Sequence, residues 1–387
     1  MTKPIFPTPR LRQDEPEEQE RRATWLELFF DLIFVVAVSQ LAHTLSEDFN
    51  LNNLPKFALL FIPVWWCWIG STFYATRFDN DSFFDRLITL AQMGIISIMA
   101  VNIDHGFDVS AFGFILSYVA FRGLLVCQYI NAGYHIQEAR PLTTWYASGF
   151  GISVLIWLSS AFVPLPWRLL LWGLGLFIDF ITPLTAGKFV KSFPPSISHI
   201  SERIGLFTII VLGESAVAVV TGISEQEWNL LSIITALCGL IIAFSFWWIY
   251  FDSVDSSALE CMKFGKMKLG LAWLYIHLPL VMGLTATGVS IEHLITNDVK
   301  FVSQPDKLLF SLAIFSCLLS LALLHWLSYN VGRTKYKKAL VYYRLIAAIL
   351  VLSTGLIVDF ISAFTLVMIF TFICLCQIIL DVNSQEV

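Results

Sequence analysis

Residues 229–251 read NLLSIITALCGLIIAFSFWWIYF, a stretch without a single charged side chain. A helix of roughly 20 apolar residues crosses the hydrocarbon core of a bilayer, which is about 30 Å thick. The stretch therefore predicts a transmembrane helix. The same signal recurs along the chain and predicts twelve spans, at 25–46, 55–76, 84–104, 109–132, 142–163, 167–189, 203–222, 229–251, 268–292, 307–330, 339–359 and 361–381.

The composition agrees with this assignment. Of the 387 residues, 57% are hydrophobic and 14% are charged, and the mean hydropathy is +0.73. Soluble domains contain about 25% charged residues, so a disordered chain and an ordinary soluble enzyme are excluded. A net charge of −5 excludes a nucleic-acid binder that works through a basic face. The expected fold is all-α, a polytopic integral membrane helix bundle of about twelve transmembrane helices.

The domain organisation follows from the charged segments. Residues 1–24 are rich in charged residues and prolines, which is typical of a disordered polar tail and not of a signal peptide. The expected order is this N-terminal tail, a first transmembrane half, a cytoplasmic linker, a second transmembrane half and a C-terminal tail. Their boundaries are 1–24, 25–190, 191–202, 203–381 and 382–387.

Lysines and arginines are distributed unevenly between the two sets of loops. The loops on the N-terminal side of the twelve spans hold 18 of them, and the opposite loops hold 4. Cytoplasmic loops carry the excess of positive charge. We therefore expect both termini in the cytoplasm and a location in the inner (cytoplasmic) membrane of the cell.

Two segments six spans apart resemble each other. Phe73–Asp79 ends the second span with aromatic residues and an aspartate, and Phe246–Asp252 ends the eighth span in the same way. Glu27 and Glu202 likewise stand shortly before a Leu-Phe pair near the start of spans one and seven. A spacing of six spans preserves orientation, so the pattern predicts a parallel 6+6 repeat of the kind found in some transporters.

Four motifs follow one another across the first nine spans. They lie at Thr24–Val35, His199–Glu214, Trp247–Asp252 and Tyr275–Pro279. In order and content they resemble the bacterial low temperature requirement A family. The resemblance implies a multipass bacterial membrane protein connected by its name with growth in the cold. It implies no particular reaction or substrate.

Two acidic residues lie close together on the first span. Glu27 and Asp31 are four residues apart and so share a helix face. Two neighbouring carboxylates in a medium of low dielectric constant repel each other, and sharing one proton would relieve this repulsion. The alternative is that Glu27 reaches the membrane interface while a cation from a neighbouring helix holds Asp31.

The entrance to the seventh span carries a second polar cluster. His199 and Glu202 are three residues apart, and Arg203 could pair with a carboxylate of another helix. Glu214 follows three turns later, after Gly213, which permits a close backbone approach or a local break. The alternatives are helix capping and interface anchoring for the first three residues, and a protonated core acid for Glu214.

Arg122 lies well inside a span and therefore requires a carboxylate partner. The deepest acids on the motif-bearing spans are candidates, so we predict a salt bridge to Glu27, Asp31 or Glu214. Asp179, which precedes Pro183, is a weaker candidate site. His277 precedes Pro279, and it either relays protons or bonds the carbonyl group that the proline frees.

The sequence carries no motif of a soluble enzyme. No nucleotide-binding, metalloprotease or nucleophile-elbow pattern occurs, and the seven cysteines match neither a zinc site nor a disulfide framework. We therefore expect no cofactor, no metal and no nucleic-acid partner, but contact with the lipid bilayer and with a small solute or ion of unknown identity. Whether the protein is an enzyme stays open.

The favoured function is a secondary transporter or permease, coupled to protons through buried carboxylates. The expected pathway residues are Glu27, Asp31, Arg122, His199, Glu202, Arg203, Glu214 and His277. The alternatives are a membrane sensor or accessory protein, and a membrane-embedded enzyme that acts at the lipid interface.

Overall fold

The structure is a computed structural model that describes residues 10–11, 24–47, 49–79, 83–107, 111–224, 230–264, 266–296, 301–331 and 337–384. Most of the predicted N-terminal tail and the end of the predicted C-terminal tail lie outside these residues. Within the N-terminal tail, β1 (Arg10–Leu11) pairs antiparallel with β2 (Phe78–Asp79).

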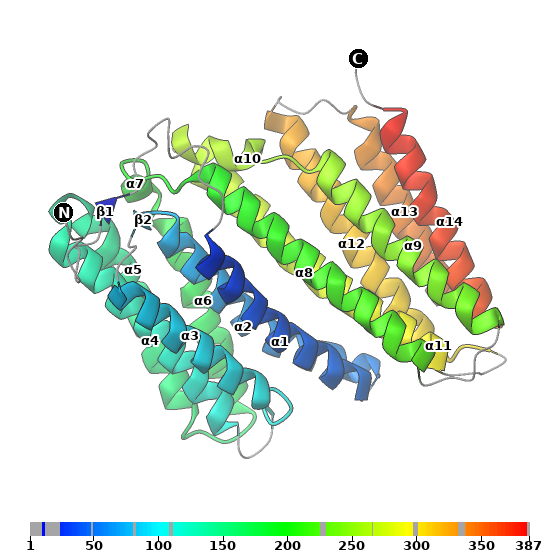
Figure 1. The fold of residues 1–387 in the computed structure, drawn as a ribbon, viewed down its shortest axis with the longest axis horizontal. Coiled ribbons are helices and arrows are strands. Elements are labelled where there is room, and N and C mark those ends of the chain that lie inside the picture. The colour runs from blue at the N-terminus through cyan, green and yellow to red at the C-terminus, as the bar shows by residue number, and fades with distance from the viewer. Residues whose placement is uncertain are drawn as a thin grey trace. The chain divides into compact units, whose positions relative to one another are not determined.

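Long helices account for most of the described chain (Figure 1). They are α1 (Trp25–Glu47), α2 (Leu54–Ala75), α3 (Phe83–Val101), α4 (Phe112–His135), α5 (Arg140–Ser160), α6 (Trp167–Thr185), α8 (Ile197–Ser224), α9 (Leu230–Ser253), α11 (Met267–Thr296), α12 (Gln304–Val331), α13 (Ala339–Ile357) and α14 (Ala363–Val382). Short helices connect them: α7 (Gly187–Val190), α10 (Ser257–Glu260) and the single turns Leu51–Asn53, Gln137–Ala139 and Cys261–Phe264. Each predicted span corresponds to one long helix.

Within the described ranges, eleven helices are long and apolar enough to cross a membrane. The remaining long helix is α5, which has 21 residues but is not among these eleven. Large apolar side chains point outward, for example Leu170 and Phe177 of α6, which are 63% and 61% exposed. Lipid is the solvent that suits such a surface, so the protein is a polytopic helical membrane bundle.

Two helix boundaries show where hydropathy predicts the end of a helix and where it does not. The break expected near Asp359 is confirmed, because α13 ends at Ile357 and α14 begins at Ala363. By contrast, α8 begins at Ile197, ahead of the predicted residue 203, and so includes part of the predicted linker. Backbone hydrogen bonds extend a helix through polar residues that a hydropathy window rejects.

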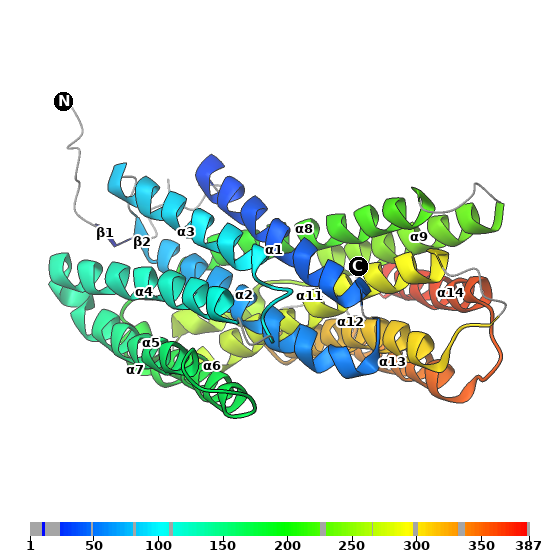
Figure 2. The ribbon, with the colours of Figure 1, turned by 90° about the horizontal axis from the view of Figure 1, so that it is seen from below.

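The described residues form two compact units. Unit 1 comprises residues 1–41, 59–206 and 259–271, and unit 2 comprises 42–58, 207–258 and 272–387. In unit 1, α3, α4, α5 and α6 pack in sequence, each against the next, and Figure 2 shows α4, α5 and α6 side by side. In unit 2, α12 packs against α13 and α9 packs against α14. The 6+6 repeat and the predicted halves stay predictions.

Arginines are prominent in the interiors of both units. Among the largest fully buried side chains of the described residues are four arginines, alongside tryptophans such as Trp68 and Trp157. The four are Arg77, Arg122, Arg203 and Arg344. Because a guanidinium group stays charged in proteins, each of these sites has to supply a counter-charge or hydrogen-bond acceptors.

Candidate functional site: buried ion pairs of unit 1

Glu27 closes the first turn of α1 and also contacts α8. Its Oε2 accepts hydrogen bonds from the backbone nitrogen of Thr24 (2.8 Å) and from the Thr24 hydroxyl (3.0 Å). The hydroxyl in turn accepts one from the backbone nitrogen of Glu27. This reciprocal arrangement is a capping box, which satisfies backbone donors at the start of a helix. The other oxygen, Oε1, lies 3.1 Å from Nε2 of His199.

Asp31 lies one turn deeper and pairs with Arg203 of α8. The aspartate is fully buried and Arg203 is 1% exposed. Arg203 donates through Nη2 to Oδ1 and through Nε to Oδ2, and the second bond is 3.3 Å long. The indole nitrogen of Trp68 also donates to Oδ1, over 2.8 Å. Asp31 is therefore a fully ligated anion.

The two pairs form a ladder between α1 and α8. Glu27 and Asp31 are four residues apart, and so are their partners His199 and Arg203. The structure thus gives each carboxylate its own basic partner, in place of the expected pair of acids that share a proton. The alternative reading of Asp31, in which a neighbouring cation holds it, is confirmed. So is the expectation that Arg203 pairs with a carboxylate of another helix.

The predicted partners of Arg122 were wrong. Its Nη2 donates to Oδ1 of Asp179 on α6 over 2.5 Å, and both side chains are fully buried. Hydropathy does not show which helices face each other, so Asp179, a weaker site candidate, is not among the partners expected for Arg122. In the folded chain α4 and α6 both pack against α5, and this arrangement brings Arg122 and Asp179 together.

Hydroxyl groups complete the coordination of Asp179. Its Oδ2 accepts hydrogen bonds from the hydroxyls of Tyr118 (2.6 Å) and Ser153 (2.8 Å). A Cβ added at Gly70 of α2 would lie 2.6 Å from Nη1 of Arg122, so a larger residue there would displace the guanidinium group. The cationic carbon of Arg122 lies 4.1 Å from the ring centre of Phe150.

Two further predicted site residues, Glu202 and Glu214, also lie on α8. Glu202 and Glu214 are half-buried positions on α8, and α8 continues unbroken through Gly213, which is exposed. A Cβ at Gly213 would meet nothing within 4 Å, so no close backbone approach requires glycine there. The predicted alternative of a break at Gly213 is therefore wrong.

His277 belongs to a separate network in unit 2. Its Nδ1 donates to the carbonyl oxygen of Trp273 over 2.7 Å, so its Nε2 accepts from the hydroxyl of Tyr250 over 3.0 Å. The histidine bonds a backbone carbonyl, as one alternative expected, but the acceptor lies one turn before it. Helix α11 continues from Met267 to Thr296 through Pro279.

Sequence reasoning missed a third buried pair, in unit 2. Arg344 of α13 donates through Nη2 to both carboxylate oxygens of Asp381 on α14, over 3.0 and 2.8 Å. The same nitrogen donates to the Ser253 hydroxyl over 2.7 Å. The count of loop charges above includes Arg344, although this residue lies inside the predicted span 339–359. Its place inside an apolar run was the available signal.

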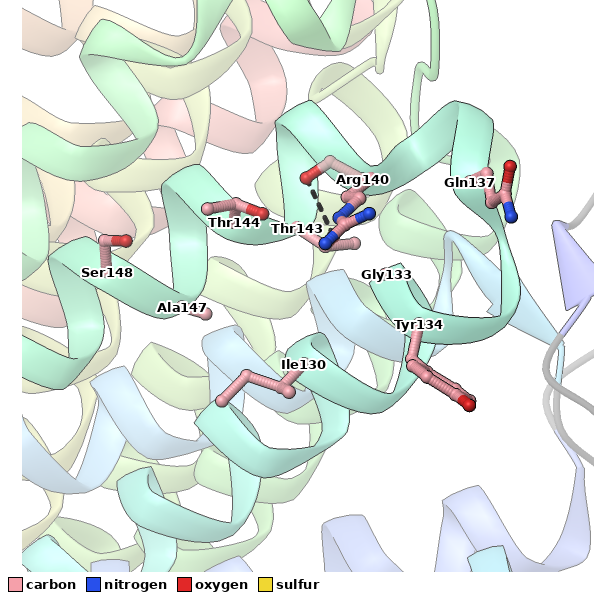
Figure 3. A pocket seen from close by; sticks show the side chains of 9 residues that line it. All are labelled: Ile130, Gly133, Tyr134, Gln137, Arg140, Thr143, Thr144, Ala147 and Ser148. Carbon is pink, nitrogen blue, oxygen red and sulfur yellow. Dashed lines mark hydrogen bonds between the residues drawn. The ribbon is translucent and has the colours of Figure 1, made fainter.

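A groove of about 480 Å³ lies on unit 1 between α4 and α5 (Figure 3). Figure 3 shows Ile130 and Tyr134 of α4 along it, with Gln137 and Arg140 at the connection between the helices. The remaining lining residues are Gly133, Thr143, Thr144, Ala147 and Ser148. None of the predicted site residues lines this groove, so the ion pairs are the better candidate site.

The helices and their buried charges define a class: polytopic helical membrane proteins with ionisable residues inside the spans. The family described as "Bacterial low temperature requirement A protein (LtrA)" matches residues 22–378, so the chain belongs to this family. The expected resemblance is thereby confirmed.

A curated relative adds no activity to this assignment. The chain is 27% identical over 303 residues to uncharacterized protein RA0937 of Rhizobium meliloti (strain 1021), which covers 72% of this chain and 70% of the relative. No solved structure matches the chain.

Proposed function

We propose that the protein is a proton-coupled secondary transporter in the cytoplasmic membrane, with both termini in the cytoplasm. The observation that carries the proposal is the ladder Glu27–His199 and Asp31–Arg203 between two apolar helices. Ionisable residues inside membrane helices are costly, and they mark ion and proton pathways in transporters.

Stability alone does not account for such pairs. Replacing a buried ion pair with apolar residues is often neutral or stabilising, because the charges lose their hydration on burial. The ladder therefore favours a functional role over a structural one. Histidine suits this role because an imidazole exchanges protons near neutral pH. Glu27–His199, at the outer end of the ladder, is the proposed proton-exchange pair, and Asp31–Arg203 is the fixed pair behind it.

The enzyme alternative receives less support. It required His199, Glu202 and Arg203 to meet at headgroup level as a catalytic group. Instead, His199 contacts Glu27, and Arg203 is bound bidentately by Asp31. A fully buried, doubly bonded arginine is poorly placed to act on a lipid at the membrane surface.

Transport by purified protein in liposomes tests the proposal. A pH gradient is imposed, a fluorescent pH indicator is trapped inside, and amino acids, organic acids and inorganic ions are added in turn. We expect at least one solute to dissipate the gradient faster with protein than without. The absence of gradient-dependent flux for the whole panel, with protein that stays folded and monodisperse, would contradict the proposal.

Matched double variants locate the activity. Asp31→Asn with Arg203→Gln neutralises the ladder pair, and Asp381→Asn with Arg344→Gln neutralises the comparable buried pair of unit 2. Both double variants avoid stranding a charge, so both are expected to fold. We expect the first to lose transport and the second to keep most of it. Equal loss in both would contradict the assignment of the site to unit 1.

A further inference from the structure

Arg77 lies in unit 1 in the turn that follows α2, and its side chain is only 2% exposed. Its Nε donates to the carbonyl oxygen of Phe193 over 3.4 Å. Its terminal nitrogens, Nη1 and Nη2, are buried and have no hydrogen-bond partner among the described residues. Unlike Arg122 and Arg203, this arginine forms no salt bridge within the described part of the chain.

Aromatic rings surround the guanidinium group. Its central carbon lies 5.3 Å from the ring centre of Phe73 and 5.3 Å from that of Tyr146. Tyr129 also reaches Arg77 through its hydroxyl group, and its ring stacks on Tyr146 at 5.2 Å, so this hydroxyl is one oxygen beside the guanidinium group. Aromatic faces attract a cation, but they do not accept the N–H groups that lie in the guanidinium plane. A ligand of Arg77 would therefore accept these N–H groups in the plane of the guanidinium group.

A second arginine with unused donors, Arg122 of α4, packs against the same helix as Arg77, namely α5. Arg122 packs on Phe150, one turn of α5 beyond Tyr146, and its Nε and Nη1 also lack hydrogen-bond partners in the described residues. Unsatisfied buried donors in a native structure point to an unseen water or ion. Water would satisfy the donors but not the charge of Arg77, which has no counter-ion among the side chains that the structure describes, and burying an uncompensated cation is costly.

We propose that Arg77 binds a small monovalent anion, a carboxylate or a halide, through Nη1 and Nη2. The fork of two parallel N–H groups matches a carboxylate bidentately, and a halide can bind between them. That this anion is the transported solute, passed inward to the unused donors of Arg122, rests on the transport function proposed above. Binding itself does not depend on that function.

Thermal unfolding of the full-length protein in detergent tests binding. Sodium acetate or sodium chloride replaces sodium sulfate at constant ionic strength, and the unfolding midpoint is followed by tryptophan fluorescence. We expect a saturable rise of the midpoint with acetate, chloride or both. The salt that raises the unfolding midpoint, acetate or chloride, identifies the kind of anion that binds. No saturable rise with either would overturn the proposal.

Variants at Arg77 make the test specific. Arg77→Met is expected to lose the anion-dependent rise while unfolding, in sulfate alone, at no lower temperature than the wild type, because it removes an uncompensated cation. Arg77→Lys keeps the charge without the fork, and we expect its half-saturating concentration to rise by about tenfold or more, as for a lost charge-assisted hydrogen bond. Lys191→Gln, at an exposed lysine of unit 1, is the control and should respond like the wild type.

The outcomes separate binding from transport. An unchanged anion response in Arg77→Met would overturn the anion site, and if that variant cannot be purified, an unchanged response in Arg77→Lys would do so. Saturable binding without flux in liposomes would leave the anion site intact and contradict the transport proposal. Flux that is unimpaired in Arg77→Met would leave transport intact and overturn the anion as its solute.

Discussion

Asp179 accepts three hydrogen bonds inside unit 1, from Arg122, Tyr118 and Ser153. Each of these bonds replaces part of the hydration that the carboxylate loses on burial among apolar helices. At the scale of single residues, the stability of a buried carboxylate therefore depends on how many of its hydrogen-bond positions are filled. Asp31 likewise accepts three hydrogen bonds, from Arg203 and Trp68, and Asp381 accepts two from one nitrogen of Arg344.

Removing the charge of Asp179 should destabilise the protein. Asp179→Asn leaves Arg122 buried without a counter-ion, and we expect a loss of about 3–5 kcal/mol in unfolding free energy. Adding Arg122→Met in the same chain should recover much of it. Thermal unfolding in detergent measures both. Asp359→Asn, at an exposed acid between α13 and α14, is the control and should stay within about 0.5 kcal/mol of the wild type. An unchanged midpoint for Asp179→Asn would show that Arg122 has another counter-ion.

At the scale of elements, the first turn of α1 combines two tasks that mutations can separate. Thr24→Ala removes the capping hydroxyl, and we expect it to cost about 1 kcal/mol with little effect on transport. Glu27→Gln keeps a capping acceptor but removes the charge beside His199. It should therefore retain most of the stability and lose the pH dependence of flux. Unfolding midpoints and flux at several pH values distinguish the two variants. Equal effects of both on flux would indicate that only helix capping matters.

The helices themselves were predictable, whereas their pairings were not. Hydropathy located α9 to within a few residues of its ends, because the cost of exposing backbone in lipid fixes the length of a span. The pairing of Arg122 with Asp179 depends on α4 and α6 both packing against α5, and no local pattern contains that information. The capping box of Thr24 and Glu27 was readable from its spacing, and it accounts for part of the role expected of Glu27.

At the scale of the whole molecule, α5 determines the topology. Eleven helices of the described residues meet the length and hydropathy expected of a span, and an odd number of spans would place the termini on opposite sides. Helix α5 packs against both α4 and α6, and its Ser153 ligates the buried Asp179. Its polar residues are thus used inside the bundle, so we count it as a twelfth span.

Reporter fusions at both ends test this count. A reporter that is active only in the cytoplasm should be active at the N-terminus and at the C-terminus. The bias of positive charge leads to the same expectation, and it persists when buried Arg344 and Lys307 are removed from the loop counts. Cytoplasmic activity at one end alone would show that α5 does not cross the membrane.

The equal spacing of the ladder between α1 and α8 has a mechanical consequence. Both partners repeat every four residues, which is a rise of about 6 Å along each helix. If α1 slid along α8 by that distance, Glu27 would reach Arg203, or in the opposite direction Asp31 would reach His199. Each position would keep one acid–base pair and release one acid and one base. The second register would have one pair fewer than the observed one, and a proton taken up by the released carboxylate would reduce the cost of reaching it. Spin-label distances between α1 and α8 that stay constant under a pH gradient would exclude the second register.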